Sequence, residues 1–322
     1  MPANFTSGWL GNGERAWHGL GTVTEGTLPA REAFETADAL FTVEKRELFF
    51  PNQGVGGLKP DGTEIPLWSP SSNYAVVRTD TQQLLGVVSK QYEIVQNDSL
   101  LRMAEFIREE ADMDSVVVLA DGAKVCFTAT LRGAETDIVP GDTIKRRLVG
   151  YLGHDGKTGC GAIFTNVRVV CCNTLAAALN SNNKVSVHHK SGANASFDAL
   201  ISSIDVARQT FAQEADLMRE FTRVSMGHTV FNEYLDEVYQ IEEGQKFRKR
   251  DKLNRAFRHG LGADYAPMSL WNAVNAVTEI ETSTRNQTAA GARRQFARAN
   301  FGVGRQISSR AIEVATAYLS AV

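Results

Sequence analysis

Apolar residues follow a period of two over much of the first 190 residues. The clearest example is a pair of runs at 116–119 and 125–131, separated by Asp121-Gly122. Apolar side chains in the second run alternate with polar ones and Cys126, and Asp-Gly favours the tight turn of a β-hairpin. The pattern predicts an antiparallel hairpin with one buried face and one face exposed to solvent.

Further strands are predicted on both sides of this hairpin. Short runs typical of strands occupy residues 74–78 and 84–88. A second hairpin is expected to join residues 146–152 to 162–170 through the turn at 154–159. All of these strands are short and bounded by turn residues, which is typical of antiparallel sheets.

Two helices are predicted among the strands. One begins at Asn97 or Asp98, which are good N-cap residues, and continues to Glu110. A shorter one covers residues 174–179 after Asn173. The stretch 181–196 is rich in Asn, Ser and Gly, and we expect a boundary or a mobile loop there.

From residue 197 onward the spacing of apolar residues changes to three and four, the period of an amphipathic helix. A long helix is predicted over residues 197–221 and a second one after Gly227. A third is expected to start at Pro267, because proline suits the first helical position, and a last one covers residues 307–319.

Strands that come first and helices that come afterwards indicate an α+β fold rather than alternating α/β. A length of 322 residues is enough for two domains. We therefore expect a strand-rich α+β core domain with antiparallel hairpins over residues 1–190. A helical, basic C-terminal region should follow over residues 197–322.

Composition predicts a soluble protein of the cytoplasm. The chain is 43% apolar and 22% charged, and no apolar run approaches the roughly 20 residues that span a bilayer. Its N-terminus lacks the basic start and apolar stretch of a signal peptide. The four cysteines, Cys126, Cys160, Cys171 and Cys172, are too unevenly spaced for a disulfide framework. A zinc site of Cys160, Cys171, Cys172 and His188 or His189 is less favoured than buried thiols.

Charge is distributed unevenly along the chain. Residues 244–322 contain 13 Lys and Arg against 5 Asp and Glu, a net charge of +8, whereas the preceding 243 residues contain 21 against 32, a net charge of −11. The overall charge of −3 therefore combines an acidic body with a basic C-terminal part. Such a basic part is able to attract a polyanion locally.

Basic side chains with aromatic rings among them are typical of single-stranded nucleic-acid binding, since phosphates contact the cations and bases stack on the rings. The candidates for base stacking are Phe247, Phe257 and Phe296. The candidates for phosphate binding in the C-terminal part are Lys246, Arg248, Lys249, Arg250, Lys252, Arg255, Arg258, Arg293, Arg294 and Arg298. A cationic edge on the second hairpin is expected from Lys145, Arg146, Arg147, Lys157 and Arg168.

Composition alone leaves a second interpretation open. The same cations also suit a solvated helix face whose charges pair with the acidic body of the protein, within one chain or across a subunit contact.

Motifs for catalysis are weak, and we predict neither an enzyme nor a cofactor. The loop at 154–161 is glycine-rich but lies between two predicted strands, whereas a P-loop joins a strand to a helix. A tight hairpin turn is favoured there. Three carboxylates would suit a metal-dependent nuclease, although their spacing is not specific: Asp137, Asp142 and Asp155.

Taken together, several segments resemble the phage/plasmid-like protein family, a prokaryotic domain of unknown function found in phages and mobile elements. The matching segments are Trp17-His18-Gly19-Leu20-Gly21, Arg78-Thr79-Asp80, Gly86-Val87-Val88-Ser89, Tyr92-Glu93-Ile94-Val95-Gln96-Asn97, His154-Asp155-Gly156, Cys171-Cys172-Asn173-Thr174-Leu175, Trp271-Asn272-Ala273-Val274-Asn275-Ala276-Val277-Thr278-Glu279 and Phe301-Gly302-Val303-Gly304. The chain departs from the family after Glu279, where an aromatic residue and an Asp-His pair often follow.

A strand-rich core followed by basic helices is also similar to phage single-strand annealing proteins of the Red-beta and Erf type. That similarity implies a homo-oligomer, in a ring or a filament, that binds single-stranded DNA and promotes annealing or recombination without ATP. Two alternatives remain at this point. One is a structural or host-interaction protein that assembles through its acidic and basic faces, and the other is the metal-dependent nuclease.

Overall fold

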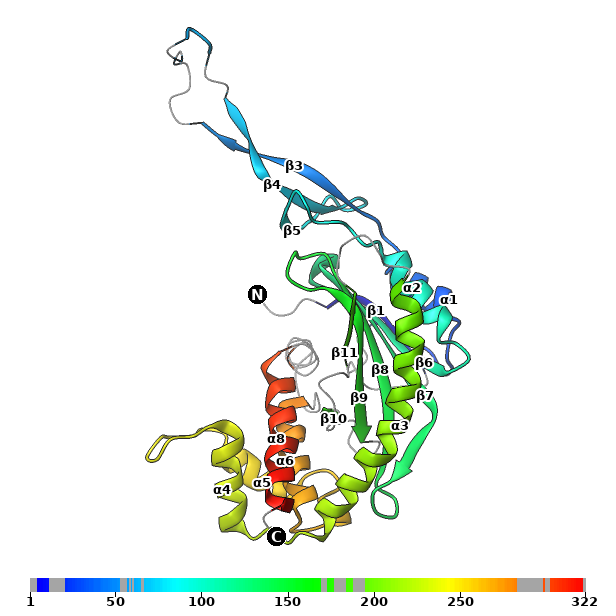
Figure 1. Cartoon of the computed structure of the whole chain (residues 1–322), viewed down its shortest axis with the longest axis vertical. Helices are drawn as coiled ribbons and strands as arrows, with labels where there is room; N and C mark the ends of the chain where they lie inside the picture. The colour runs from blue at the N-terminus through cyan, green and yellow to red at the C-terminus, as the bar shows by residue number, and fades with distance from the viewer. Residues whose placement is uncertain are drawn as a thin grey trace.

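Figure 1 shows an elongated molecule in which a β-ribbon arm, a large sheet and a group of helices follow one another. The strand-rich N-terminal part is paired mainly antiparallel and is followed by helices, so the expected α+β class is confirmed. The computed structural model describes residues 5–11, 21–52, 57, 59, 61–64, 67–168, 173–176, 184–187, 195–282, 298 and 302–320.

The main sheet has the order β10-β9-β8-β7-β6-β1-β2, and β11 also pairs with β9. Both predicted hairpins are present, since β6 pairs with β7 and β8 with β9. In the described part of the chain only the β1–β2 pair is parallel. The strands are β1 Phe5–Leu10, β2 Thr22–Val23, β6 Ala111–Leu119, β7 Lys124–Asp137, β8 Thr143–Gly153, β9 Cys160–Arg168, β10 Asn173–Ala176 and β11 Lys184–Val187.

The prediction that one face of the β6–β7 hairpin is exposed to solvent is wrong. Phe127 belongs to the main core, but Cys126 on the opposite face is also buried, within a second apolar cluster that includes Tyr151. Thr128 is buried on that face too, and its hydroxyl is satisfied by the hydroxyl of Ser115 at 2.8 Å. A local alternation of polarity does not reveal what packs over a strand from elsewhere in the chain.

Seven helices and two short 3-10 turns are described beside the sheets. The long helix expected over 197–221, the helix after Gly227 and the last helix are confirmed as α3, α4 and α8. The helices are α1 Ala30–Thr36, α2 Asn97–Phe106, α3 Ala195–Arg223, α4 His228–Tyr239, α5 Arg250–His259, α6 Leu270–Thr282 and α8 Val303–Ser320, with η2 Ala120–Gly122 and η3 Ala263–Tyr265.

Four local predictions are wrong. The short helix expected after Asn173 is strand β10, because residues 173–176 pair with the edge of β9. Part of the stretch 181–196 is strand β11, which pairs with β9 as well. Helix α6 begins at Leu270 rather than Pro267, and α2 ends at Phe106 instead of Glu110.

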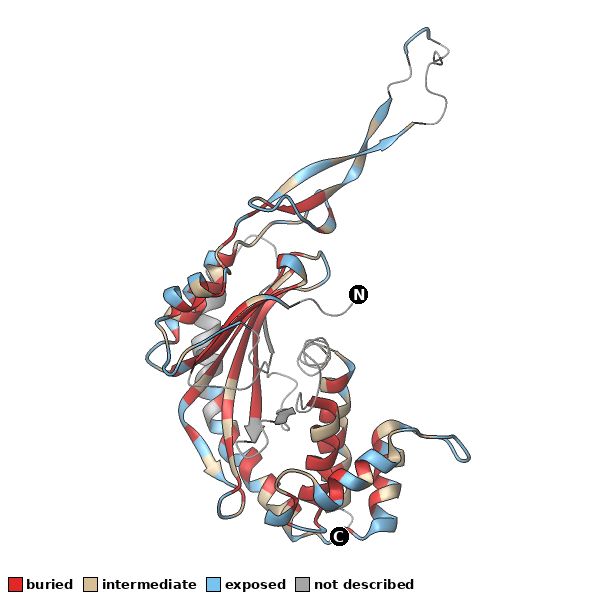
Figure 2. Cartoon of the chain, turned by 180° about the vertical axis from the view of Figure 1, so that it is seen from behind, coloured by how far each residue is buried: buried red, intermediate tan, exposed pale blue. Residues whose placement is uncertain are grey.

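The arm is a separate three-stranded sheet of β3 Val43–Pro51, β4 Trp68–Arg78 and β5 Leu84–Ser89, and it projects away from the body (Figures 1 and 2). Strand β5 pairs with the inner part of β4, at residues 73–77. Beyond that point β3 and β4 continue as a two-stranded ribbon. Large apolar side chains are more than half exposed on this outer part: Phe49, Phe50, Leu67 and Trp68.

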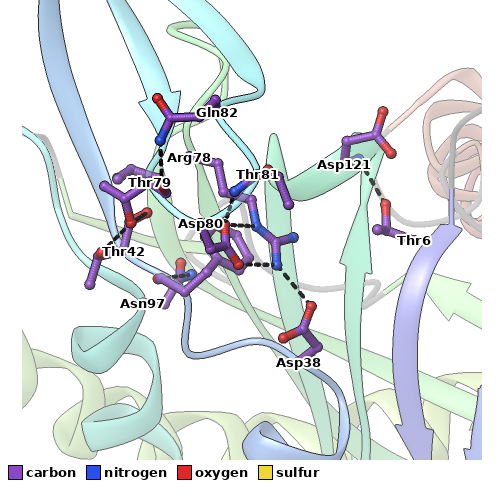
Figure 3. A network of polar contacts seen from close by, with 12 residues as sticks. Thr6, Asp38, Thr42, Arg78, Thr79, Asp80, Thr81, Gln82, Asn97 and Asp121 are labelled. Atoms are coloured by element: carbon purple, nitrogen blue, oxygen red, sulfur yellow. Dashed lines mark hydrogen bonds and ion pairs between the residues drawn. The ribbon is translucent and has the colours of Figure 1, made fainter.

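Arg78 ties the base of the arm to the body (Figure 3). Its guanidinium is 3% exposed and donates hydrogen bonds of 2.8 Å to Asp38 and to both carboxylate oxygens of Asp80. It also lies over the ring of Phe41, 4.0 Å from the centroid. Gly122 touches this stack; its φ of +110° suits glycine, and a Cβ there would lie 2.8 Å from the Phe41 ring. The Arg78-x-Asp80 motif thus has a structural role, because Asp80 neutralises the buried cation of Arg78.

Three more of the motif segments meet at the same joint. Asn97 donates to the carbonyl oxygen of Phe41 at 3.0 Å, and its own carbonyl oxygen lies 2.8 Å from His154 Nε2. Gly86 approaches the β8–β9 turn so closely that a Cβ would lie 2.6 Å from the carbonyl carbon of Asp155. These contacts fix the arm on the end of the main sheet.

Helix α3 is held on the main sheet by a fully buried ion pair. Arg146 in β8 and Glu214 in α3 both have side chains that are 0% exposed, and their nearest atoms are 2.5 Å apart. Asn166 of β9 donates to the same carboxylate at 2.7 Å, and Thr210 accepts from the guanidinium at 3.2 Å. Burial lowers the pKa of Arg146, and the charge of Glu214 opposes that effect.

Removing one partner of this pair should destabilise the fold. We expect Glu214→Ala to lower the free energy of unfolding by about 3–5 kcal/mol, because the guanidinium of Arg146 stays buried without its counter-charge. Urea unfolding followed by circular dichroism measures the change. The double variant Arg146→Met/Glu214→Leu should recover most of the loss, and a Glu214→Ala protein as stable as the parent would contradict this role.

Candidate nucleic-acid interface

Helix α5 is short, amphipathic and strongly basic. Leu253, Ala256 and Phe257 are buried against the rest of the helical region, while the side chains between them are polar or charged. Spacings of three and four place the apolar residues on one stripe and leave the cations on the remaining surface. Lys246 to Lys249 precede the helix rather than forming part of it.

Three of the predicted phosphate ligands are instead neutralised by carboxylates of the same chain. Lys249 and Arg298 both form ion pairs with Glu281, whose side chain is 0% exposed. Arg250 forms an ion pair with Asp236 of α4. These three cations therefore hold helices together, as the second interpretation of the sequence expected.

The neighbours of Glu281 stabilise its charged form. Burial by itself would raise the pKa of this carboxyl, but the hydrogen bond and charge of Lys249 and the hydrogen bond from Tyr239 at 2.8 Å lower it overall, assisted by the charge of Arg298. Burial and the carboxylate raise the pKa of the Tyr239 hydroxyl in turn. Glu281 is thus held as an anion between two cations.

Five other candidates are exposed to solvent and form no ion pair with any described carboxylate. They lie on the loop before α5 and on its outer surface: Lys246, Arg248, Lys252, Arg255 and Arg258. Such side chains are free to bind phosphate. We call them the open cations.

A pocket of about 720 Å³ lies beside the open cations, between α4 and α5. The sequence patterns did not predict it, because α4 and α5 are separate helices, with residues 240–249 between them, and their packing depends on tertiary contacts. Its lining residues are His228, Asn232, Arg250, Asp251, Asn254, Arg255, Arg258 and His259.

The inner residues of the pocket form a polar network. Asn232 Oδ1 accepts hydrogen bonds from Arg250 at 3.1 Å and from Asn254 at 3.2 Å. The amide nitrogen of Asn232 donates to the carbonyl oxygen of His228 at 2.8 Å. These amides are half-buried, whereas Arg255 and Arg258 at the rim are exposed.

The expected role of Phe257 in base stacking is wrong. Its ring is 1% exposed and stacks on Phe231 of α4, with 4.1 Å between centroids and 11° between planes. The ring forms an apolar contact between α5 and α4 there. Phe247 is half-buried and packs on Tyr239 at 4.6 Å, so at most one of its edges is open. Phe296 lies outside the described residues.

The second hairpin does not form the open cationic edge that was expected. Arg146 is fully buried, Lys145 pairs with Glu135 at 3.0 Å, and Arg147 lies 2.9 Å from a carboxylate oxygen of Asp114. Lys157 is exposed on the turn. The side chain of Arg168, and Arg293 and Arg294 altogether, lie outside the described residues.

The three candidate metal carboxylates act as hydrogen-bond acceptors at opposite ends of β8. Asp142 accepts from the Trp271 indole at 2.8 Å, and Asp137 accepts from the Thr143 hydroxyl at 2.5 Å. Asp155 closes the β8–β9 turn. Within the described ranges, no group of three or more His, Cys, Asp and Glu side chains is arranged to hold a metal ion.

Burial raises the pKa of two thiols, that of Cys126 to about 12 and that of Cys160 to about 11. Both are free and buried, as expected for small apolar side chains rather than for metal ligands. Cys171 and Cys172 lie outside the described residues.

A family model for the domain of unknown function DUF932 matches residues 84–308, which is more than half of the chain. The chain belongs to this family. The match begins within the arm and ends in α8, so it includes the β8–β9 hairpin, the pocket and the open cations. No curated protein and no solved structure matches the chain. None of the described helices of this DUF932 member is both long and apolar enough to cross a membrane.

Loss of the charge at Glu281 should weaken the helical region in a pH-dependent way. We expect Glu281→Gln to lower the free energy of unfolding at pH 7 by on the order of 2 kcal/mol, since charge-assisted hydrogen bonds are lost. The folded-state pKa lies below the ordinary value of 4.5, so this contribution is present above that value and disappears as pH falls through the folded pKa.

Urea unfolding of parent and variant between pH 3 and pH 7 tests this linkage. The difference between their unfolding free energies should shrink at the acidic end. Glu242→Gln, which changes an exposed loop carboxylate, is the control and should leave stability unchanged at every pH. A difference for Glu281→Gln that is constant with pH would contradict the assignment.

Proposed function

We propose that this protein binds single-stranded nucleic acid, with DNA as the expected partner, through the open cations of the α4–α5 region. The observation that carries the proposal is that these five cations are exposed and form no ion pair with a described carboxylate, and that two of them, Arg255 and Arg258, line a pocket. We further propose that it acts as an oligomer in the host cytoplasm, promoting annealing or recombination without ATP for a phage or plasmid.

Electrostatics supports binding to a polyanion. A phosphate backbone that contacts Lys and Arg releases condensed counterions, which makes association favourable and dependent on salt. The N-terminal 243 residues have a net charge of −11, so a nucleic acid would be repelled from the body and directed towards the basic region.

A preference for single-stranded over double-stranded nucleic acid depends on exposed aromatic rings on which bases can stack. With Phe257 buried, the described residues of the basic region offer one partly open ring, that of Phe247. The preference therefore depends mainly on the similarity to phage single-strand annealing proteins. Phosphate contact, which single and double strands share, is the better supported part of the proposal.

The arm supports self-assembly. Its outer ribbon exposes Phe49, Phe50, Leu67 and Trp68, each by 51–60%, and a bare two-stranded ribbon is marginally stable in water. The same outer part carries Asp61 and Glu64 against Lys59, so its charge does not favour nucleic acid. A second copy of the chain is the partner that we propose for this surface.

A structural or host-interaction protein is the competing proposal. The observation that favours it is the internal pairing of Lys249, Arg250 and Arg298, which shows that part of the basic region already serves protein contacts. In that case the open cations would meet the acidic body of a neighbouring copy.

Salt dependence separates these two proposals. If about five phosphates of a single strand are neutralised, the logarithm of the association constant should fall with the logarithm of salt concentration at a slope near −3.5. Fluorescence anisotropy of a labelled oligonucleotide measures it. The variant Lys252→Gln/Arg255→Gln/Arg258→Gln should make the slope shallower by about 2.

A matched variant controls for the change in net charge. Arg31→Gln/Arg102→Gln/Arg108→Gln removes three exposed cations near α1 and α2 that already have carboxylate partners, and it should leave the slope unchanged. A flat response of the parent protein to salt would remove nucleic acid as the main partner.

The role of the arm is tested by its apolar side chains. We expect Phe49→Ser/Trp68→Ser to lower the molar mass in solution, because the apolar contact between copies is lost; multi-angle light scattering measures this mass. The control Val206→Ser/Val303→Ser changes two exposed apolar residues outside the arm and should not alter the mass. An unchanged mass for the arm variant would exclude the arm from assembly.

A further inference from the structure

The exposed cations of the basic region fall into two groups. Arg255 and Arg258 line the pocket between α4 and α5, whereas Lys246, Arg248 and Lys252 do not. The pocket is open to solvent, and its volume of about 720 Å³ is in the range of sites that hold a small molecule. It is therefore large enough for a phosphate group to enter.

The pocket has a half-buried floor and an exposed rim. Asn232, Arg250 and Asn254 form the floor, through the hydrogen bonds between their side chains.

Donors reach the pocket from two helices. Arg255 and Arg258 come from α5, and His228 is the first residue of α4, with its ring held edge-on against Phe257 at 5.9 Å. The cap of α4 is Gly227, which provides no side-chain cap, so the positive end of the 12-residue helix lies beside the pocket.

Two acceptors on the floor side of the pocket, in contrast, are already engaged. The carbonyl oxygen of Asn232 is held by Arg250 and Asn254, and the carboxylate of Asp236 pairs with Arg250. Asp251 is the one carboxylate in the lining. The surface presented to a ligand is therefore rich in donors.

Charge distinguishes a terminal phosphate monoester from an internal phosphodiester. The lining has three arginines and Asp251, and counting Asp236 leaves a net charge of +1, to which the end of α4 adds about half a charge. A phosphate monoester carries about −1.5 to −2 at pH 7 and has three terminal oxygens. An internal phosphodiester carries −1 and has two free oxygens. The monoester matches the pocket better in both charge and number of acceptors.

We infer that the α4–α5 pocket binds a terminal phosphate monoester of a nucleotide, at the end of a nucleic-acid strand or on a free nucleotide. For the strand end, this inference rests on the proposed function. Arg255 and Arg258 grip the phosphate at the rim, and the amide network positions it from below. Lys246, Arg248 and Lys252 contact the phosphates that follow along the strand.

The test compares short oligonucleotides of one sequence that end in a 5′-phosphate, a 3′-phosphate or hydroxyl groups only. Fluorescence anisotropy with the full-length protein should give about tenfold tighter binding for one of the phosphorylated ends. Arg255→Gln/Arg258→Gln should remove that preference. The matched variant Lys246→Gln/Arg248→Gln, outside the pocket, should weaken all three oligonucleotides alike and keep the ratio.

Equal affinity for all three ends would overturn the inference while leaving the proposed function intact. If none of the oligonucleotides binds, the proposed function is contradicted instead. In that case calorimetric titration with a nucleoside 5′-monophosphate decides: heat that is lost in Arg255→Gln/Arg258→Gln supports the pocket as a free-nucleotide site, and absence of heat with the parent protein overturns it.

Discussion

The Arg146–Glu214 ion pair joins the middle of the main sheet to the long helix that leads into the helical region. A cation that leaves water has to be neutralised by a carboxylate of its own chain, because a lone buried charge is too costly. The same constraint acts on Arg78 at the base of the arm. It also acts, with the charges reversed, on the buried carboxylate of Glu281, which pairs with Lys249 and Arg298. Among the described cations that remain exposed without a carboxylate partner are those at the surface of α5 and in the loop before it, and these are the ones that we propose for a partner.

The segments that resemble the phage/plasmid-like family are explained largely by architecture. Arg78, Gly86, Asn97 and His154 meet where the arm joins the sheet, and Trp271 ties α6 to the β7–β8 turn through Asp142. They hold the three parts of the molecule at fixed positions. A partner bound at the helical end and a copy bound at the arm would therefore keep a defined geometry relative to each other.

Sequence patterns predicted the elements whose signals are local. Alternation and Asp-Gly identified the β6–β7 hairpin, and the spacing of apolar residues identified α3 and α4. Contacts between distant residues could not be predicted in this way. No local pattern around Arg146 predicts its pairing with Glu214, which lies 68 residues away. Strand β10 likewise depends on pairing with the edge of β9. Phe257 has the composition of a stacking residue, but its partner is Phe231 rather than a base.

The central claim is that nucleic acid is bound by the exposed cations beside the α4–α5 pocket. Photo-crosslinking of the full-length protein to an oligonucleotide containing 4-thiothymidine, followed by mass spectrometry of the peptides, tests it most directly. We expect crosslinks concentrated in residues 228–259. Crosslinks confined to the arm or to the acidic face of the body, with none in that segment, would contradict it.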